Sequence, residues 1–353
     1  MVQQTNPQEL SFWGQLLMVG LPGPRLDAQA RELVRDLKVG GMILFARNIE
    51  SPEQVWELCR DLQHEAAAAS GQPLLISVDQ EGGPVQRFKA PFTIIPPARD
   101  LGIGATPEEV EDLSRRVARE LALVGINMNL APVLDVPRSP ACPLWHRAYS
   151  SDPERAARYA LAAIRGYAAG GVFPVGKHFP GLGDTMADSH EVLPRALSED
   201  AKREADLLPF RLAAAAGVPA VMTAHLLVPK WDDRPATLSA TALQDWLRRR
   251  LKFQGVIITD DLEMGAIASQ LPVDRAAQAA LEAGADLLLI CNNLNAVWDT
   301  ARLLAGDSSL LSRAKDAALR IRRLREGIKL PPHGLKEVKE YFRQASEGRV
   351  KGD

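Results

Sequence analysis

The chain has 353 residues, of which 46% are hydrophobic and 24% are charged, a length that suits two average domains or one large barrel domain. Its net charge of −2 and pI of about 6.3 give no basic surface of the kind that binds nucleic acid or anionic lipid. The three cysteines, Cys59, Cys142 and Cys291, are far apart, so the sequence predicts no disulfide framework and favours a reducing compartment.

The N-terminal segment MVQQTNPQELSFWGQ lacks the basic stretch and apolar core of a secretory signal. The longest apolar runs of the chain are much shorter than the roughly 20 residues that span a bilayer. We therefore expect a cytoplasmic protein with neither a membrane nor a nucleic acid as partner.

Eight short apolar runs follow one another along the chain. Several are continuous rather than alternating, which is typical of parallel strands covered on both faces. The runs are Leu16–Val19, Met42–Phe45, Leu74–Val78, Ile126–Leu130, Val172–Val175, Ala220–Ala224, Val256–Ile258 and Leu287–Ile290.

Helical patterns lie between many of these runs. Thr106-Pro107 and Asp152-Pro153 are typical helix starts, and Gly125 is the predicted end of the first of these helices. Strands alternating with helices predict a single (β/α)8 barrel over residues 1–330, followed by a C-terminal helix and tail over 331–353. The structural alternative is an open doubly wound sheet. That fold would be expected to have a glycine-rich phosphate-binding turn after an early strand, and the sequence has none.

Reactive side chains follow five consecutive runs. They are Asp79 and Arg87 after the third run, Asp135 and Arg147 after the fourth, Lys177 and His178 after the fifth, His225 after the sixth, and Asp260 and Asp261 after the seventh. Because the active sites of such barrels lie at the carboxyl ends of the strands, we expect these side chains to meet in one cavity.

The segment GKHFPGLGDTMADSHEVLP, residues 176–194, is unusually long for a connection between a strand and a helix, and long connections tend to be functional. Gly181 and Gly183 predict sharp turns in it. Asp188 and His190 are two residues apart, so in an extended stretch their side chains point the same way, and the carboxylate can orient the imidazole.

The segment KHFPGLGDTMADSH resembles the signature of glycoside hydrolase family 3, in particular its β-N-acetylglucosaminidase branch. Motifs in the same order over roughly residues 14–300 agree with this resemblance: DQEGGPVQRF (79–88), NMNLAPVLDV (127–136), HRAYS (146–150), AHLLVPKWDDRPATLS (224–239) and GVIITDDLEMGAI (255–267). The family fold is a (β/α)8 barrel, which matches the independent count of strands.

The resemblance implies a role for each matching residue. Asp260 matches the nucleophile, and His190 with Asp188 matches the acid/base pair of this branch. The residues that match the sugar-binding set are Asp79, Arg87, Arg147, Lys177 and His178. Without the resemblance, Asp135 is interpreted as a hydrogen-bond acceptor, and His225 stays open between support and substrate contact. Asp261 is interpreted as a structural residue that points away from Asp260 if the strand continues.

These roles imply an exo-acting, retaining enzyme that removes terminal β-linked N-acetylglucosamine through a covalent glycosyl-enzyme. The imidazole first donates a proton to the leaving oxygen and then activates water, so no metal or organic cofactor is expected. The implied substrates are small carbohydrates, namely peptidoglycan-derived fragments in the cytoplasm, and we expect a monomer. Within the family, β-glucosidase activity and phosphate as the acceptor remain open.

Three further hypotheses come from other classes of protein. A metal-dependent barrel hydrolase could use the residues at successive strand ends, Lys177, His178, His225 and Asp260. Such an enzyme would usually have a His-x-His pair after the first strand, and residues 16–27 contain no histidine. A Schiff-base aldolase could use Lys177, and a sugar-binding barrel would need no catalysis. Two residues depart from the family pattern, Leu182 in place of a histidine and Pro84 in place of an arginine, and both bear on contacts beyond the terminal sugar.

Overall fold

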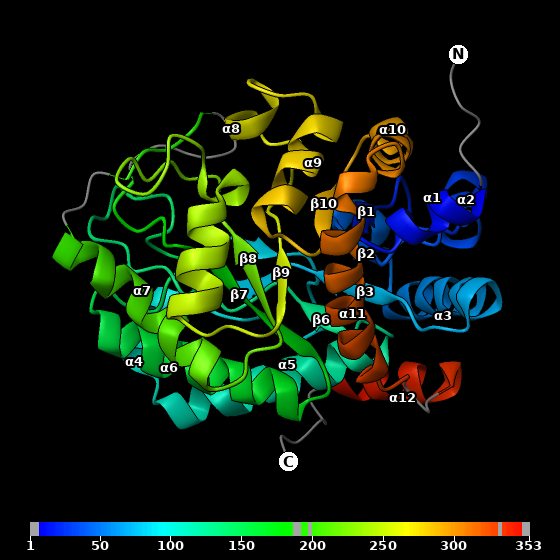
Figure 1. The fold of residues 1–353 in the computed structure, drawn as a ribbon. Helices are drawn as coiled ribbons and strands as arrows, with labels where there is room; N and C mark the ends of the chain where they lie inside the picture. Colours follow the sequence, from blue (N-terminus) through cyan, green and yellow to red (C-terminus); the bar gives the residue numbers. More distant parts are fainter. Residues whose placement is uncertain (1–6, 186–191, 197–199, 331–333, 348–353) are drawn as a thin grey trace.

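The computed structural model describes residues 7–185, 192–196, 200–330 and 334–347. Eight parallel strands lie at the centre of the molecule and helices surround them (Figure 1). The barrel strands are β1 (Leu17–Gly20), β2 (Gly41–Leu44), β3 (Leu75–Val78), β6 (Met128–Asn129), β7 (Phe173–Phe179), β8 (Ala220–Thr223), β9 (Val256–Ile258) and β10 (Leu288–Ile290), and β4 (Gln80–Gly82) and β5 (Val85–Gln86) form a separate hairpin.

The α-helices are α1 (Pro7–Gly14), α2 (Ala28–Arg35), α3 (Pro52–Ser70), α4 (Ala98–Gly104), α5 (Pro107–Leu123), α6 (Pro153–Ala169), α7 (Asp200–Ala215), α8 (Gly265–Ala268), α9 (Val273–Ala283), α10 (Leu294–Ala305), α11 (Leu311–Glu326) and α12 (Leu335–Ser346). A π-helix, η3, covers Thr241–Arg250, and short 3-10 turns are η1 (Ala46–Asn48), η2 (Ala236–Leu238) and η4 (Ser308–Leu310).

The strands follow the chain around the barrel, in the order β10-β1-β2-β3-β6-β7-β8-β9. A parallel bridge between Ile258 and Leu287 joins the two ends of this order and closes the barrel. Each of the eight apolar runs contributes one strand, which confirms the predicted (β/α)8 barrel. The strands are buried along nearly their whole length because helices cover their outer faces and side chains fill the interior.

The predicted helix starts are confirmed. Thr106 caps α5, and its hydroxyl and the Glu109 carboxylate form a reciprocal capping box. Asp152 caps α6 by accepting from the Arg155 backbone N–H at 2.7 Å. Helix α5 ends at Leu123, two residues before Gly125, whose φ of +93° reverses the chain toward β6.

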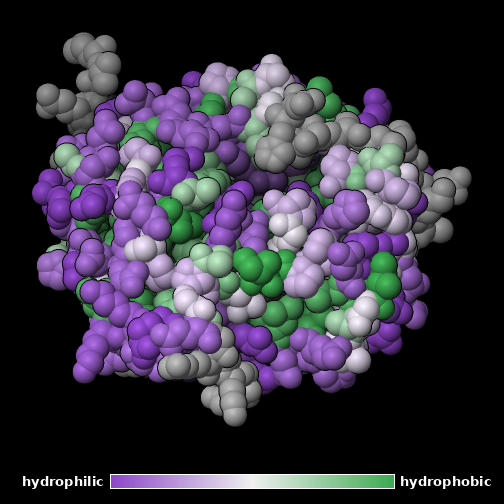
Figure 2. All heavy atoms as spheres, turned by 180° about the vertical axis from the view of Figure 1, so that it is seen from behind, coloured by the Kyte–Doolittle hydropathy of each residue, from purple (hydrophilic) through white to green (hydrophobic). Residues whose placement is uncertain are grey.

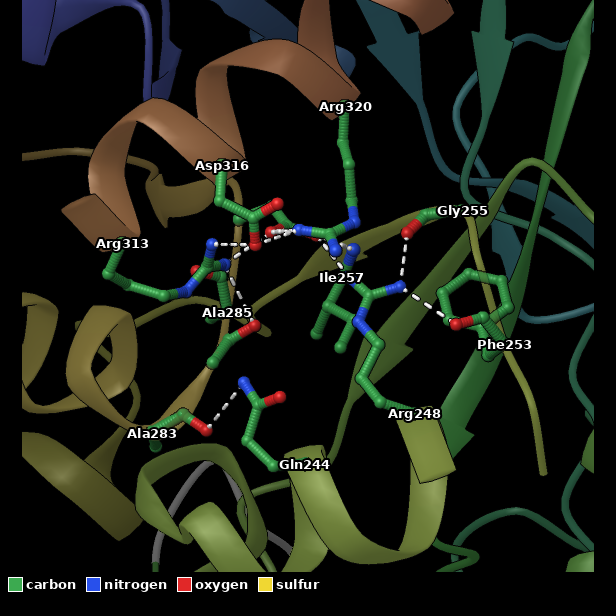
Figure 3. A network of polar contacts seen from close by, with 12 residues as sticks. Gln244, Arg248, Phe253, Gly255, Ile257, Ala283, Ala285, Arg313, Asp316 and Arg320 are labelled. Carbon is green, nitrogen blue, oxygen red and sulfur yellow. Dashed lines mark hydrogen bonds and ion pairs between the residues drawn. The ribbon is translucent and has the colours of Figure 1, made fainter. Parts of the chain in front are cut away.

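The amino-terminal end of the β9–β10 seam is held by a buried carboxylate, Asp286. It accepts the Ile257 backbone N–H at 2.9 Å and is paired with three arginines, Arg248 of η3 and Arg313 and Arg320 of α11. Figure 3 shows these three guanidinium groups converging beside Ile257. The charged network therefore ties two outer helices to the junction at which the barrel closes.

The outer surface is mixed in character. Figure 2 shows one face on which hydrophilic side chains predominate and hydrophobic ones form small patches. The C-terminal helix α12 packs against α3, and the Phe342 ring lies 4.4 Å from that of Phe92. In the described part of the chain, no helix is both long and apolar enough to cross a membrane.

Candidate active site

A cavity of about 510 Å³ opens at the carboxyl ends of the strands. Its floor is apolar and comes from alternate strands, with Ile43 of β2, Leu130 just after β6, Met222 of β8 and Leu289 of β10. This is the layered arrangement of barrel interiors, in which every second strand contributes to one layer. Most of the charged groups of the cavity lie on β7 or follow the ends of β3 and β9, and Arg147 comes from the segment between β6 and α6.

Six of the eight residues predicted for the site line this one cavity, although they come from distant parts of the chain: Asp79, Arg87, Arg147, Lys177, His178 and Asp260. The predicted pair Asp188 and His190 lies outside the described residues.

Lys177 is the centre of the ionic contacts in the cavity. Its Nζ lies 2.7 Å from Oδ1 of Asp79 and 2.6 Å from Oε1 of Glu81, and its side chain is almost fully buried. Arg87 approaches the other oxygen of Asp79 at 3.5 Å. Burial alone would lower the pKa of Lys177, but the two carboxylates raise it, so the ammonium keeps its charge.

Glu81 is a member of this site to which the sequence assigned no role. Its carboxylate accepts both Nε and a terminal nitrogen of Arg147 at 2.9 Å, in addition to Lys177. Burial would raise the pKa of Glu81, but Lys177 and Arg147 hold it well below its ordinary value. The spacing of two residues from Asp79 was a visible signal, because the β4–β5 hairpin directly follows β3 at the strand end.

His178 is held from behind by Asp135, as expected of a hydrogen-bond acceptor. Asp135 Oδ2 lies 2.7 Å from Nδ1 of His178, and its other oxygen accepts the Leu182 backbone N–H at 2.7 Å. The opposite ring nitrogen of His178 lies 3.4 Å from Arg147. The ladder between β7 and β8 is irregular between Gly176 and Phe179, so Lys177 and His178 both line the cavity although they are neighbours in the chain.

Asp260 is the second residue after the end of β9, and its carboxylate accepts a hydrogen bond from the Asp261 backbone N–H at 2.9 Å. Burial would raise its pKa, but His225, His178, that N–H and Lys177 lower it below the ordinary value, which favours an ionised carboxylate. His225 is completely buried, with one ring nitrogen 2.9 Å from the Thr237 hydroxyl and the other 2.8 Å from the Asp261 carbonyl. Both nitrogens are engaged by the protein, so His225 supports the segment around Asp260.

The condition on which the expected orientation of Asp261 depended is not met. The expectation assumed that the strand continues through Asp260, but β9 ends at Ile258, and Asp261 lines the same cavity as Asp260. Burial raises the pKa of Asp261 to about 7, opposed by the hydrogen bond from the Glu263 N–H and reinforced by the charges of Glu263 and Asp260.

The two departures from the family pattern lie in different surroundings. Leu182 is buried, lines the cavity and packs in an apolar cluster with Cys142 and Leu144. Pro84 is exposed in the turn between β4 and β5. Leu182 therefore replaces a polar position of the family with an apolar part of the cavity wall.

The root of the long connection after β7 is closely packed. Gly181 has a φ of +110°, as a sharp turn requires. Gly183 does not have a positive φ; a Cβ there would lie 2.0 Å from the Val136 carbonyl oxygen, so close backbone approach is the reason for this glycine. Arg203 of α7 donates to the carbonyls of Pro180 and Gly181 at 3.3 and 3.1 Å.

A closed eight-stranded barrel with clustered carboxylates and cations at the carboxyl ends of its strands is the arrangement expected of a barrel glycoside hydrolase. The chain matches the family described as "Glycosyl hydrolase family 3 N terminal domain" over residues 12–324 and belongs to this family. It is therefore a glycoside hydrolase.

Individual relatives agree with this assignment. A β-hexosaminidase of Alkalilimnicola ehrlichii is 41% identical over 288 residues, covering 80% of this chain and 82% of the relative. A family 3 β-N-acetylglucosaminidase from Paenibacillus superposes with a TM-score of 0.86 at 36% identity, covering 96% of this chain and 68% of the other. NagZ from Neisseria gonorrhoeae, in complex with N-trifluoroacetyl-D-glucosamine, gives a TM-score of 0.75 at 32% identity, covering 94% and 97%.

Proposed function

We propose that the chain is an exo-acting, retaining β-N-acetylglucosaminidase in which Asp260 is the nucleophile. The observation that carries this proposal is the position of the Asp260 carboxylate, whose pKa is lowered by its neighbours, in a cavity that Lys177, Arg147 and His178 also line. A retaining glycosidase needs a carboxylate that attacks the anomeric carbon while an acid protonates the departing oxygen. The relatives named β-hexosaminidase and the glucosamine-derived ligand of the Neisseria protein support N-acetylglucosamine as the sugar.

The terminal sugar is bound by charged groups on β7 and in the segments that follow β3 and β6. Asp79 supplies acceptors, and Lys177, Arg87 and Arg147 supply donors, so hydroxyl groups can be paired in both directions. A site built from such paired groups rejects a sugar that leaves one partner unsatisfied. Glu81 stabilises two of the cations in place, so their orientation does not depend on the substrate.

The acid/base role is assigned to His190 with Asp188 on the strength of the DSH motif. Asp260 attacks the anomeric carbon while the His190 imidazolium gives its proton to the leaving oxygen, forming the glycosyl-enzyme. The neutral imidazole then removes a proton from water, which attacks the anomeric carbon and releases Asp260 as a carboxylate. An imidazole suits both steps because its ordinary pKa of about 6.5 lies near working pH.

The natural substrate and the cellular compartment belong to the same proposal. The family resemblance supports fragments of peptidoglycan that carry a terminal N-acetylglucosamine, degraded during recycling in the cytoplasm. Because Leu182 makes this part of the cavity wall apolar, we expect the aglycone preference of this chain to differ from that of relatives with histidine at this position.

The test compares chromogenic β-N-acetylglucosaminide, β-glucoside and β-xyloside as substrates of the wild type and of Asp260→Asn, His190→Ala and Asp61→Asn. Asp61 is paired with Arg60 on the exposed face of α3, so its variant is the matched control and keeps wild-type turnover. We expect the acetamido sugar to be preferred and Asp260→Asn to lose at least about 10⁴-fold in kcat. Dominant β-glucosidase activity that does not depend on His190 would overturn the assignment, and products formed only with phosphate would make the enzyme a phosphorylase.

A further inference from the structure

Asp260 stands at an irregularity in the seam that closes the barrel. The Leu287 N–H donates to the Ile257 carbonyl and the Thr259 N–H donates to the Leu287 carbonyl, both at 3.0 Å, as in a regular parallel ladder. The next regular step would bring the N–H of Asp261 to the Leu289 carbonyl. Instead, the N–H of Leu262 donates there at 3.0 Å, so one extra residue is inserted beside Asp260.

The extra residue has a consequence for the carboxylate. Because the Asp261 N–H is released from the ladder, it donates to Oδ1 of Asp260 at 2.9 Å. The other side of the same step is also altered. The N–H of Leu289, which a regular ladder would pair with the Thr259 carbonyl, donates to the Thr259 hydroxyl at 2.9 Å.

The Thr259 hydroxyl therefore accepts the hydrogen bond that the Thr259 carbonyl would accept in a regular ladder. Thr259 is completely buried and directly precedes Asp260, and its hydroxyl joins β10 to the chain where the extra residue begins. On the other side of Asp260, the Asp261 carbonyl is held by His225 at 2.8 Å. Farther along, the Glu263 carboxylate accepts the backbone N–H groups of Asn292 and Asn293, so the segment is tied to the loop after β10.

We propose that Thr259 is a positioning residue for catalysis, whose hydroxyl holds the irregular step of the β9–β10 seam and thereby the direction of the Asp260 carboxylate. The inference rests on the proposed role of Asp260 as nucleophile. Thr259 is not one of the residues that line the cavity, so it acts on the rate of attack rather than on binding of the sugar. A carboxylate displaced by a fraction of an ångström loses alignment with the anomeric carbon without losing the contacts that bind the hydroxyls.

The experiment replaces Thr259 by Val, which keeps the shape and removes the acceptor, and by Ser, which keeps the hydroxyl. We expect Thr259→Val to lower kcat about 10- to 100-fold with KM changed by less than about threefold, and Thr259→Ser to stay within about threefold of wild type. The Ki of free N-acetylglucosamine, which reports binding of the sugar, stays unchanged. The loss in kcat/KM persists with a 2,4-dinitrophenyl leaving group, because such a group relieves the need for an acid but not for a nucleophile.

The matched control is Thr300→Val in α10, since the Thr300 hydroxyl is buried and has no hydrogen-bond partner in the structure as described. It makes the same change without removing a contact and keeps wild-type kinetics.

Wild-type kcat in Thr259→Val, or recovery of its activity with the activated leaving group, overturns the inference. If Thr259→Val does not fold, Thr259→Cys replaces it, and the inference then requires kcat of Cys below that of Ser. Full activity of Asp260→Asn would instead overturn the proposed function itself.

Discussion

At the scale of single residues, two buried carboxylates hold the cationic and imidazole groups of the cavity in place. Glu81 holds Lys177 and Arg147, and Asp135 holds His178 and the Leu182 backbone. A flexible cation in water loses conformational entropy when it binds a sugar, whereas a cation already paired in a buried network has lost it on folding. We therefore expect Glu81 and Asp135 to contribute to sugar binding through the groups that they orient.

Replacement of Glu81 by Gln tests this view. The glutamine amide is neutral and has one acceptor oxygen, so it cannot replace the carboxylate that pairs with both Arg147 and Lys177. We therefore expect kcat/KM for β-N-acetylglucosaminide to fall about 10- to 100-fold. Because one partner of a buried ion network is removed, stability falls by up to about 3–5 kcal/mol. Steady-state kinetics and urea unfolding measure the two effects. Glu57→Gln on the exposed side of α3 is the control, and kinetics equal to that control would contradict a role for Glu81.

Asp261 gives a prediction for the dependence of stability on pH. Its pKa is raised by burial to about 7 from an ordinary value of 3.8, so between these values the folded chain binds more protons than the unfolded one. Its contribution to stability is complete below pH 4 and is lost as pH rises through about 7, with a slope of at most about 1.4 kcal/mol per pH unit. Asp261→Asn removes this contribution. Melting temperatures at pH 5 and pH 8 should therefore differ less in the variant than in the wild type; an equal difference would show that Asp261 titrates normally.

At the scale of elements, the connection after β7 is fastened at its root before it reaches the DSH motif. Residues 180–185 contact α7 through Arg203 and the segment after β6 through Gly183, whose carbonyl accepts the Arg138 N–H at 3.0 Å. Beyond the motif, residues 194–196 pair with Leu227, with the Ala196 N–H donating to its carbonyl at 2.8 Å. Both described flanks of the motif are thus bonded to neighbouring strand ends.

Gly183→Ala tests the importance of this root. A methyl group there collides with the Val136 backbone, so we expect the variant to lose about 1–3 kcal/mol of stability by overpacking. We also expect a lower kcat/KM, since residues 182 and 185 line the cavity. Thermal unfolding and steady-state kinetics measure both. Gly104→Ala is the control, because nothing lies within 4 Å of its added Cβ. Equal behaviour of the two variants would show that the root tolerates displacement.

At the scale of the whole molecule, barrel closure depends on side chains because β9 and β10 share only one backbone bridge, Ile258 with Leu287. Asp286 supports the amino-terminal end of this seam and Glu263 the carboxyl end, where Asp260 lies. Figure 3 shows that the support at the amino-terminal end extends outward to α11 through Arg313 and Arg320. Closure of the barrel and placement of the candidate nucleophile therefore share one junction.

Asp286→Asn tests the support of the seam. The variant keeps the size of the side chain but leaves three arginines without their common anion, so we expect a loss of about 3–5 kcal/mol in the free energy of unfolding. Asp299→Asn breaks an exposed pair with Arg302 on α10 and should cost at most about 1 kcal/mol. Urea unfolding of both variants compares them directly. A loss for Asp286→Asn no larger than for Asp299→Asn would refute the role of the network.

The barrel and six of the ionisable residues that line the cavity could be predicted from the sequence. Continuous apolar runs are local signals, and parallel strands place whatever follows them at one end of the sheet, so Asp79, Lys177 and Asp260 could be placed together without coordinates. The tertiary structure decided which carboxylates face the cavity and which stand behind it. The surroundings of Asp261 and Thr259 could not be predicted, because they depend on the one extra residue beside Asp260, which no local pattern of apolar residues reveals. The spacing of Glu81 from Asp79 was a signal in the sequence, but its pairing with Lys177 and Arg147 depends on contacts across the barrel.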